Sequence, residues 1–132
     1  RSVRVEGVEP AVRLVSAEQL GAAVADEVRL VRHRHHNTGV VVPEALLAHA
    51  ADALAAAGLT ATDRVHDLGH DDVPLFHAEA VKGLEFDGVV VVNPHEIFDG
   101  SERGARLLYV AMTRAVQVLH FVTTAPLPAE LG

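Results

Sequence analysis

Two short segments of this sequence carry residues whose types suit chemistry on a phosphate group. Residues 81–87 read VKGLEFD and residues 106–115 read RLLYVAMTRA. Gly83 permits a tight turn and a close backbone approach in the first segment. In the second, Arg114 offers a guanidinium that stays charged and can donate two hydrogen bonds at once. Taken alone, an arginine late in a helix more often forms a surface ion pair than a phosphate contact. The residues around Arg114 in the sequence are therefore needed to choose between these two roles.

The sequence lacks the residues and motifs that several other kinds of functional site require. The chain has no cysteine, which excludes disulfides, thiolate zinc sites and cysteine nucleophiles. The phosphate-binding loop GxxxxGK[ST] is absent, as is GxGxxG after a strand. No Ser/His/Asp arrangement with an elbow motif is present, and the carboxylates form no recognisable acid–base pair. We therefore expect the chain on its own, without Walker A and B motifs, to be inactive as an ATP hydrolase.

The nine histidines raise the question of a metal site. A metal needs three or four convergent ligands. His66 and His70 are four residues apart, but Gly69 lies between them in a stretch typical of a turn. His33, His35 and His36 form the basic end of a predicted helix. Neither group shows a third partner, so solvated histidines are the simpler interpretation and no metal site is predicted.

The charge balance narrows the class of protein. Eleven Lys and Arg stand against 18 Asp and Glu, for a net charge of −7, and Lys82 is the sole lysine. An acidic chain is a poor freestanding nucleic-acid binder, because phosphate contacts need concentrated positive charge. No apolar run reaches the length of a membrane span and no signal-peptide pattern opens the chain. The composition predicts one domain over residues 1–132, in a cytoplasmic setting.

The elements that must position the two segments alternate between strand and helix. Residues 3–15 form two short extended pieces in this interpretation. Strands are predicted at 38–42, 63–68, 75–80, 88–93 and 118–123, and helices at 16–32, 43–57 and 105–115. Continuous valine runs such as 89–92 suit strands buried on both faces of a sheet. This alternation predicts an α/β fold with a mainly parallel sheet.

Together the two segments resemble motifs V and VI of superfamily 1 helicases of the UvrD/Rep type. In that family a KGLEF turn is followed by a valine-rich strand and later by a YVALTRA helix, and both occur here in that order. The resemblance implies the C-terminal, second RecA-like domain, a three-layer α/β domain without its own P-loop. Motif V would be residues 81–87 and motif VI residues 106–115.

The resemblance also implies a function. Such a domain is a motor domain of an ATP-dependent DNA helicase or translocase, and it binds ATP and Mg²⁺ jointly with an N-terminal RecA-like domain. By resemblance, Arg114 is the arginine finger, and Gly83 and Glu85 contact nucleotide, Glu85 near the ribose. Lys82 would support the turn and Thr113 would orient Arg114. Glu85 could equally be a solvated carboxylate in the first turn of a helix.

Two positions depart from the family pattern. The family has a Thr and a His upstream of KGLEF that face the DNA strand, whereas this chain has His77 and Glu79 there. A carboxylate is unfavourable beside a DNA phosphate. This departure and the acidic balance indicate an alternative, a HelD-like ATPase domain that works through RNA polymerase contacts rather than single-stranded DNA. A degenerate domain that keeps the motifs for packing alone is a third interpretation.

Overall fold

A six-stranded sheet with the order β1-β6-β5-β2-β4-β3 forms the centre of the fold. The computed structural model describes residues 10–131. Each pair of neighbouring strands runs parallel. The strands are β1 (Ala11–Leu14), β2 (Thr38–Val42), β3 (Thr60–Thr62), β4 (Asp72–His77), β5 (Phe86–Val92) and β6 (Ala115–Thr123).

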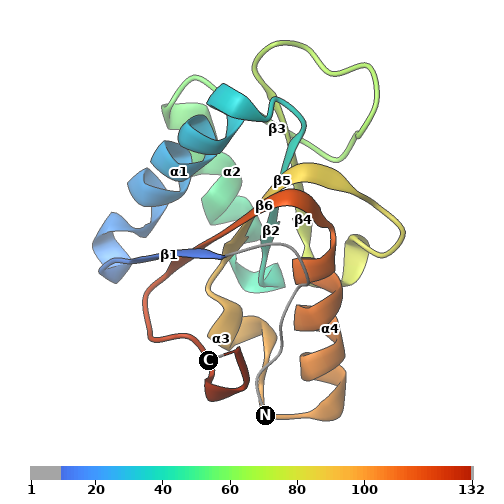
Figure 1. Cartoon of the computed structure of the whole chain (residues 1–132). Helices are drawn as coiled ribbons and strands as arrows, with labels where there is room; N and C mark the ends of the chain where they lie inside the picture. Colours follow the sequence, from blue (N-terminus) through green and yellow to red (C-terminus); the bar gives the residue numbers. More distant parts are fainter. Residues whose placement is uncertain (1–9, 132) are drawn as a thin grey trace.

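Helices cover both faces of this sheet (Figure 1). The α-helices are α1 (Leu20–Arg34), α2 (Leu47–Ala56), α3 (Pro94–Ile97) and α4 (Glu102–Thr113). Short 3₁₀ turns are η1 (Ala17–Gln19), η2 (Glu44–Leu46), η3 (Ala78–Ala80) and η4 (Ala129–Leu131). Helices α1 and α2 pack together on one face, and α4 lies on the other. The predicted three-layer α/β fold with a parallel sheet is confirmed.

Strand β5 shows why two separate cores form. Its successive side chains point to opposite faces, as the twofold period of a strand requires. Val90 and Val92 belong to the core beneath α1 and α2. Val89 and Val91 belong to the core beneath α4. All four are at most 1% exposed, so the valine run is buried on both faces, as its sequence predicts.

Serine caps begin the 3₁₀ turn η1, which leads into α1, and the helix α4. The Ser16 hydroxyl accepts a hydrogen bond of 3.3 Å from the Gln19 amide, and α1 follows after η1. The Ser101 hydroxyl accepts one of 2.9 Å from the Gly104 amide at the start of α4. Such caps satisfy amides that have no partner within the helix. Helix α4 therefore begins before residue 105, where the sequence pattern had predicted its start.

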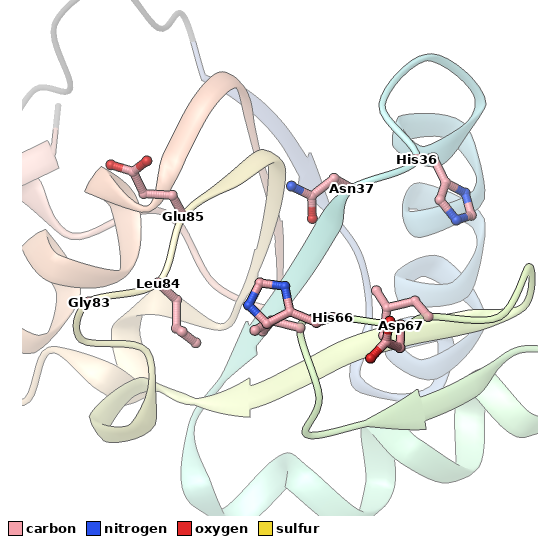
Figure 2. Close-up of a pocket in the computed structure, with 9 residues that line it drawn as sticks. His36, Asn37, His66, Asp67, Gly83, Leu84 and Glu85 are labelled. Carbon is pink, nitrogen blue, oxygen red and sulfur yellow. The ribbon is translucent and has the colours of Figure 1, made fainter.

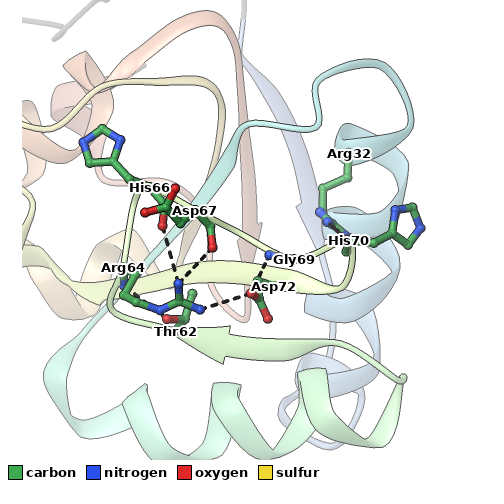
Figure 3. A network of polar contacts seen from close by, with 8 residues as sticks. All are labelled: Arg32, Thr62, Arg64, His66, Asp67, Gly69, His70 and Asp72. Atoms are coloured by element: carbon green, nitrogen blue, oxygen red, sulfur yellow. Dashed lines mark hydrogen bonds and ion pairs between the residues drawn. The ribbon is translucent and has the colours of Figure 1, made fainter.

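The segment 63–68, predicted as a strand, is a loop (Figure 3). The Arg64 guanidinium donates to the carbonyl oxygens of His66, at 3.5 Å, and Asp67, at 2.9 Å. It also pairs with the Asp72 carboxylate at 3.2 Å. Asp67 has a φ of 56°, which interrupts an extended backbone. The strand at this sheet edge is instead β3, which pairs with the start of β4.

Other element boundaries also differ from the predicted ones. Strand β4 covers 72–77 rather than 75–80, because residues 78–80 turn into η3. Strand β6 begins at Ala115 rather than 118, directly after α4 ends. The short helix α3 was not predicted. The extended piece predicted before residue 10 lies outside the described residues. Among residues 10–131, no helix has the length and apolar character needed to cross a membrane.

Candidate functional site

The two motif segments meet at the amino edge of the sheet. Strands β5 and β6 are parallel neighbours, and Phe86 is the register partner of Ala115. The Phe86 amide donates a hydrogen bond of 2.9 Å to the carbonyl oxygen of Arg114. Glu85 and Arg114 each stand one residue before this pair. The sheet topology therefore brings the turn of residues 81–85 beside the end of helix α4.

The turn itself depends on Gly83. The Leu84 amide donates a hydrogen bond of 3.1 Å to the Val81 carbonyl, which closes a four-residue turn. Gly83 has a φ of +85°, and an added Cβ would meet no atom within 4 Å. Glycine adopts this conformation without the steric penalty of other residues. The backbone at Gly83 is consequently open to an approaching group, while Lys82 beside it is exposed.

Glu85 is exposed and directly precedes β5. The alternative interpretation placed this carboxylate in solvent in the first turn of a helix; its exposure agrees with that interpretation, but the helical position is wrong because the turn leads into β5. No helix dipole is available there to stabilise its charge. Glu85 is instead held at the sheet edge because the next residue, Phe86, is anchored in the core and is only 1% exposed.

Arg114 is the C-cap residue of α4 and is half-buried. Its Nε donates to the Val110 carbonyl at 3.0 Å, and its Nη2 donates to the Thr113 hydroxyl at 3.1 Å. The Thr113 hydroxyl itself donates to the Val110 carbonyl at 3.0 Å. Among the side chains that the structure describes, no carboxylate oxygen lies within 4 Å of the Arg114 guanidinium. The surface ion pair that a lone arginine would favour is therefore not formed with any described residue.

A pocket of about 500 Å³ opens at the same edge (Figure 2). One wall is the turn of residues 83–85, and the opposite wall is the loop of residues 65–68. Asn37, just before β2, also lines the pocket, and His66 of the loop wall is labelled with it in Figure 2. Arg114 and Lys82 are not among the lining residues. Asn37 had no sequence signal beyond its position directly before a buried strand.

The loop wall is held by its own polar network (Figure 3). Besides the Arg64 contacts, the Gly69 amide donates to the Asp72 carboxylate at 2.7 Å. Arg32, at the end of α1, donates to the His70 carbonyl. The rings of His36 and His70 stack with their centroids 6.0 Å apart. The loop is thus tied to both α1 and β4, although it has no regular secondary structure.

His77 and Glu79 lie at the opposite, carboxyl edge of the sheet. His77 is the last residue of β4 and Glu79 belongs to η3. The Glu79 carboxylate forms an ion pair with Arg103 of α4. Both line a second pocket, of about 190 Å³, which Glu44 also lines. The two sequence departures are therefore neighbours in space and are distant along the sheet from the turn at Gly83.

Asp99 stands near that second pocket, in the connection between α3 and α4. Its Oδ1 accepts hydrogen bonds from the Ser101 hydroxyl at 2.5 Å and from the Ser101 amide at 3.0 Å. The hydrogen bond from the Ser101 hydroxyl is the largest cause that lowers the pKa of Asp99, and the bond from the Ser101 amide is the second. Both bonds favour the ionised carboxylate. This carboxylate and the Ser101 cap together organise the start of the helix that ends at Arg114.

One buried polar contact had no sequence signal. Glu27 of α1 is only 6% exposed. Its Oε2 lies 2.5 Å from Nδ1 of His120 in β6, and its Oε1 accepts a hydrogen bond of 3.4 Å from Arg13 in β1. The helical period of the sequence could have placed Glu27 on the apolar face of α1. It could not have predicted that the partners of Glu27 lie on β1 and β6.

Comparison with known proteins agrees with the family resemblance of the two motif segments. Residues 78–122 match the family model for the UvrD-like helicase C-terminal domain. A solved structure described as the C-terminal domain of a possible DNA helicase from Lactobacillus plantarum WCFS1 is similar over 93% of this chain and 77% of its own. Its sequence is 25% identical and the TM-score is 0.70. No curated protein matches the chain.

The matched stretch contains the turn at Gly83, strand β5 and the whole of α4, with Arg114 at its end. The structural similarity extends over the rest of the sheet and its helices. The resemblance predicted from residues 81–87 and 106–115 is confirmed. This chain has the sequence motifs and the fold of a UvrD-like helicase C-terminal domain.

Proposed function

We propose that the chain is the second RecA-like lobe of an ATP-dependent DNA helicase or translocase. It completes an ATP site whose phosphate-binding loop belongs to an N-terminal lobe. The observation that carries the proposal is the convergence of Gly83, Glu85 and Arg114 on one sheet edge, through the Phe86–Arg114 hydrogen bond. ATP and its Mg²⁺ supply the reacting phosphate and neutralise part of its charge.

Arg114 acts on the γ-phosphate in this proposal. Its guanidinium carries a permanent charge, is half-buried and has no carboxylate partner among the described side chains, so it is available to an anion. The bonds to Val110 and Thr113 hold two of its nitrogens against the end of α4. Thr113 therefore acts as a positioning residue, and the guanidinium can meet developing charge without a large rearrangement.

The turn of residues 81–85 contributes an open backbone surface and one carboxylate to the proposed nucleotide site. The open backbone at Gly83 lets a nucleotide approach closely, since no side chain occupies that space. Glu85 accepts hydrogen bonds from ribose hydroxyls in this proposal, because it is exposed, lines the pocket and has no basic partner within 4 Å among the described residues. Lys82 supports the turn and adds positive potential beside it. The polar wall of Asn37 and His66 faces the same pocket.

The experiment substitutes Arg114 in the intact protein that holds both lobes. Arg114→Ala should lower ATP turnover by about 10³- to 10⁵-fold, the range typical of arginine fingers, with little loss of ATP binding. Arg106→Ala is the matched control, since Arg106 lies on the same helix, is 70% exposed and pairs only with Glu102. Near-normal turnover in Arg114→Ala would contradict the proposal, as would an equal loss in Arg106→Ala.

A second function, as a HelD-like domain acting through RNA polymerase, has one specific observation in its favour. The pocket at the carboxyl edge, where relatives would contact DNA, is lined by Glu44, Glu79, Glu96 and Asp99. Arg103 is the only arginine or lysine of that lining, and it is paired with Glu79. Such a surface repels a DNA phosphate. Strong stimulation of the intact ATPase by single-stranded DNA, without affinity for RNA polymerase, would rule this function out.

A further inference from the structure

Three metal-ligating side chains converge at the carboxyl edge of the sheet. Glu44 is the first residue of η2, just beyond the end of β2. His77 ends β4, where it is the register partner of Val42, and Glu79 follows in η3. One ligand atom from each of the three lies within 4.8 Å of the other two. Among the residues that the structure describes, no other group of three or more such side chains meets this criterion.

The charges around this cluster favour a cation. The same pocket of about 190 Å³ is lined by two further carboxylates, those of Glu96 and Asp99. One guanidinium, that of Arg103, stands against these four acidic groups. Arg103 engages a carboxylate oxygen of Glu79, Oε2, which leaves the second oxygen of Glu79 for another partner.

His77 supplies an independent observation. Its Nδ1 atom is buried and has no hydrogen-bond partner among the described residues. A buried polar atom without a partner costs free energy, so such atoms are normally satisfied by protein, water or an ion. The imidazole therefore stands beside two carboxylates with part of its hydrogen-bonding capacity unused. An ion or a water bound by Nδ1 would remove this deficit.

We propose that Glu44, His77 and Glu79 bind a divalent cation of the zinc class. One imidazole nitrogen and two carboxylate oxygens form a ligand set that zinc accepts, at about 2.0–2.2 Å from each atom. Imidazole disfavours Mg²⁺ and Ca²⁺, which prefer oxygen ligands. Both glutamates are exposed and His77 is half-buried, and the three ligand atoms already lie within 4.8 Å of one another. Water completes the coordination. The bound ion ties the ends of β2 and β4 together at the edge opposite the proposed ATP site.

Calorimetric titration of the nucleotide-free protein with ZnCl₂ tests the site. We expect one ion per chain, a higher melting temperature and little response to MgCl₂. Glu44→Gln, an exposed substitution that should leave the fold intact, and His77→Gln should each weaken Zn²⁺ binding by about 100-fold or more, beyond the 10- to 100-fold typical of outer-shell losses. Arg103→Gln should strengthen binding, because it removes a competing positive charge and frees Oε2 of Glu79.

A matched control separates this site from the other histidines. The double substitution His36→Gln and His70→Gln removes the stacked pair of rings near the first pocket. It should leave the Zn²⁺ affinity unchanged. The proposal is overturned if the protein binds no Zn²⁺ at millimolar concentration, or if the His36/His70 variant loses binding while Glu44→Gln and His77→Gln keep it. None of these outcomes depends on ATP turnover, so failure here is distinct from failure of the proposed ATPase role.

Discussion

The amide of Phe86 and the carbonyl oxygen of Arg114 are joined by a hydrogen bond of 2.9 Å. This one contact fixes the start of β5 against the end of α4. Because Phe86 follows the turn of residues 81–85 and Arg114 closes the helix of motif VI, the two motifs share a rigid connection. The side chain of Phe86 is buried in the core beneath α4, which anchors this connection to the fold.

Gly39 makes the position of Phe86 possible. A Cβ at Gly39 would lie 2.7 Å from two atoms of the Phe86 ring. Gly39→Ala should therefore destabilise the protein by about 1–3 kcal/mol, as overpacking does. Urea unfolding measures this loss. Phe86→Leu in the same background should recover part of it, and strictly additive effects of the two substitutions would contradict the proposed clash.

Glu27 should contribute more to stability than its exposed neighbour Asp26. Glu27→Ala removes a buried carboxylate that contacts both His120 and Arg13, and we expect a loss of about 1.5–3 kcal/mol. Asp26→Ala removes a partner of the same Arg13 at 3.7 Å, but the Asp26 side chain is 66% exposed. Its loss should stay below about 1 kcal/mol. Equal losses in chemical denaturation would contradict the role assigned to the buried contact.

The lowered pKa of Asp99 predicts a dependence of stability on acid pH. The ionised form of Asp99 is favoured in the folded state, so its contribution to stability is present above the ordinary aspartate pKa of the unfolded chain, 3.8. The contribution is lost as the pH falls through the lower folded pKa. Ser101→Ala removes the largest cause, the side-chain hydrogen bond, and also the cap of α4. It should cost about 1 kcal/mol at neutral pH.

Ser101→Ala should also return the Asp99 pKa toward its ordinary value, which NMR titration of the carboxyl resonance measures. The difference in unfolding free energy between wild type and variant should shrink below about pH 4, as Asp99 becomes protonated. A difference that is constant down to pH 2 would show that Asp99 does not contribute through its charge.

Glu85 should distinguish ribose from deoxyribose in the intact protein. If its carboxylate accepts hydrogen bonds from the ribose hydroxyls, Glu85→Gln weakens ATP binding more than dATP binding, by about 1.5–3 kcal/mol for a charged partner. Asp87→Asn is the control, because Asp87 is exposed and lies two residues further along β5. An unchanged ratio of the two KM values in Glu85→Gln would contradict the ribose contact.

Much of this architecture could be predicted from local patterns. The valine runs of β2 and β5 are buried on both faces, so their hydrophobicity alone identified them as central strands. Ser16 and the helical period of residues 20–31 located α1. The motif residues Gly83, Glu85 and Arg114 were found because their order and spacing are specific, and the parallel pairing of β5 and β6 brings them together.

The missed features depend on contacts between distant residues. The strand prediction at 63–68 was wrong although a turn pattern begins within it, because the conformation of the loop also depends on Arg64 reaching the Asp72 carboxylate. Glu44 had no signal as a neighbour of His77, since that proximity follows from the pairing of β2 with β4. The strand predicted at 75–80 ends too late in the sequence. The chain turns into η3 after His77, where Ala78 packs into the core beneath α4, and this contact is also between distant residues.

The most direct measurement of the central claim compares the binding of ADP with that of its aluminium fluoride complex, a transition-state analogue, to the intact two-lobe protein. Interactions that accelerate a reaction are stronger in the transition state than in the ground state. If Arg114 completes the ATP site, wild type and Arg106→Ala bind the analogue far more tightly than ADP. Arg114→Ala should then lose about 10³-fold or more of that preference while its Kd for ADP barely changes. A preference that survives in Arg114→Ala would contradict the account.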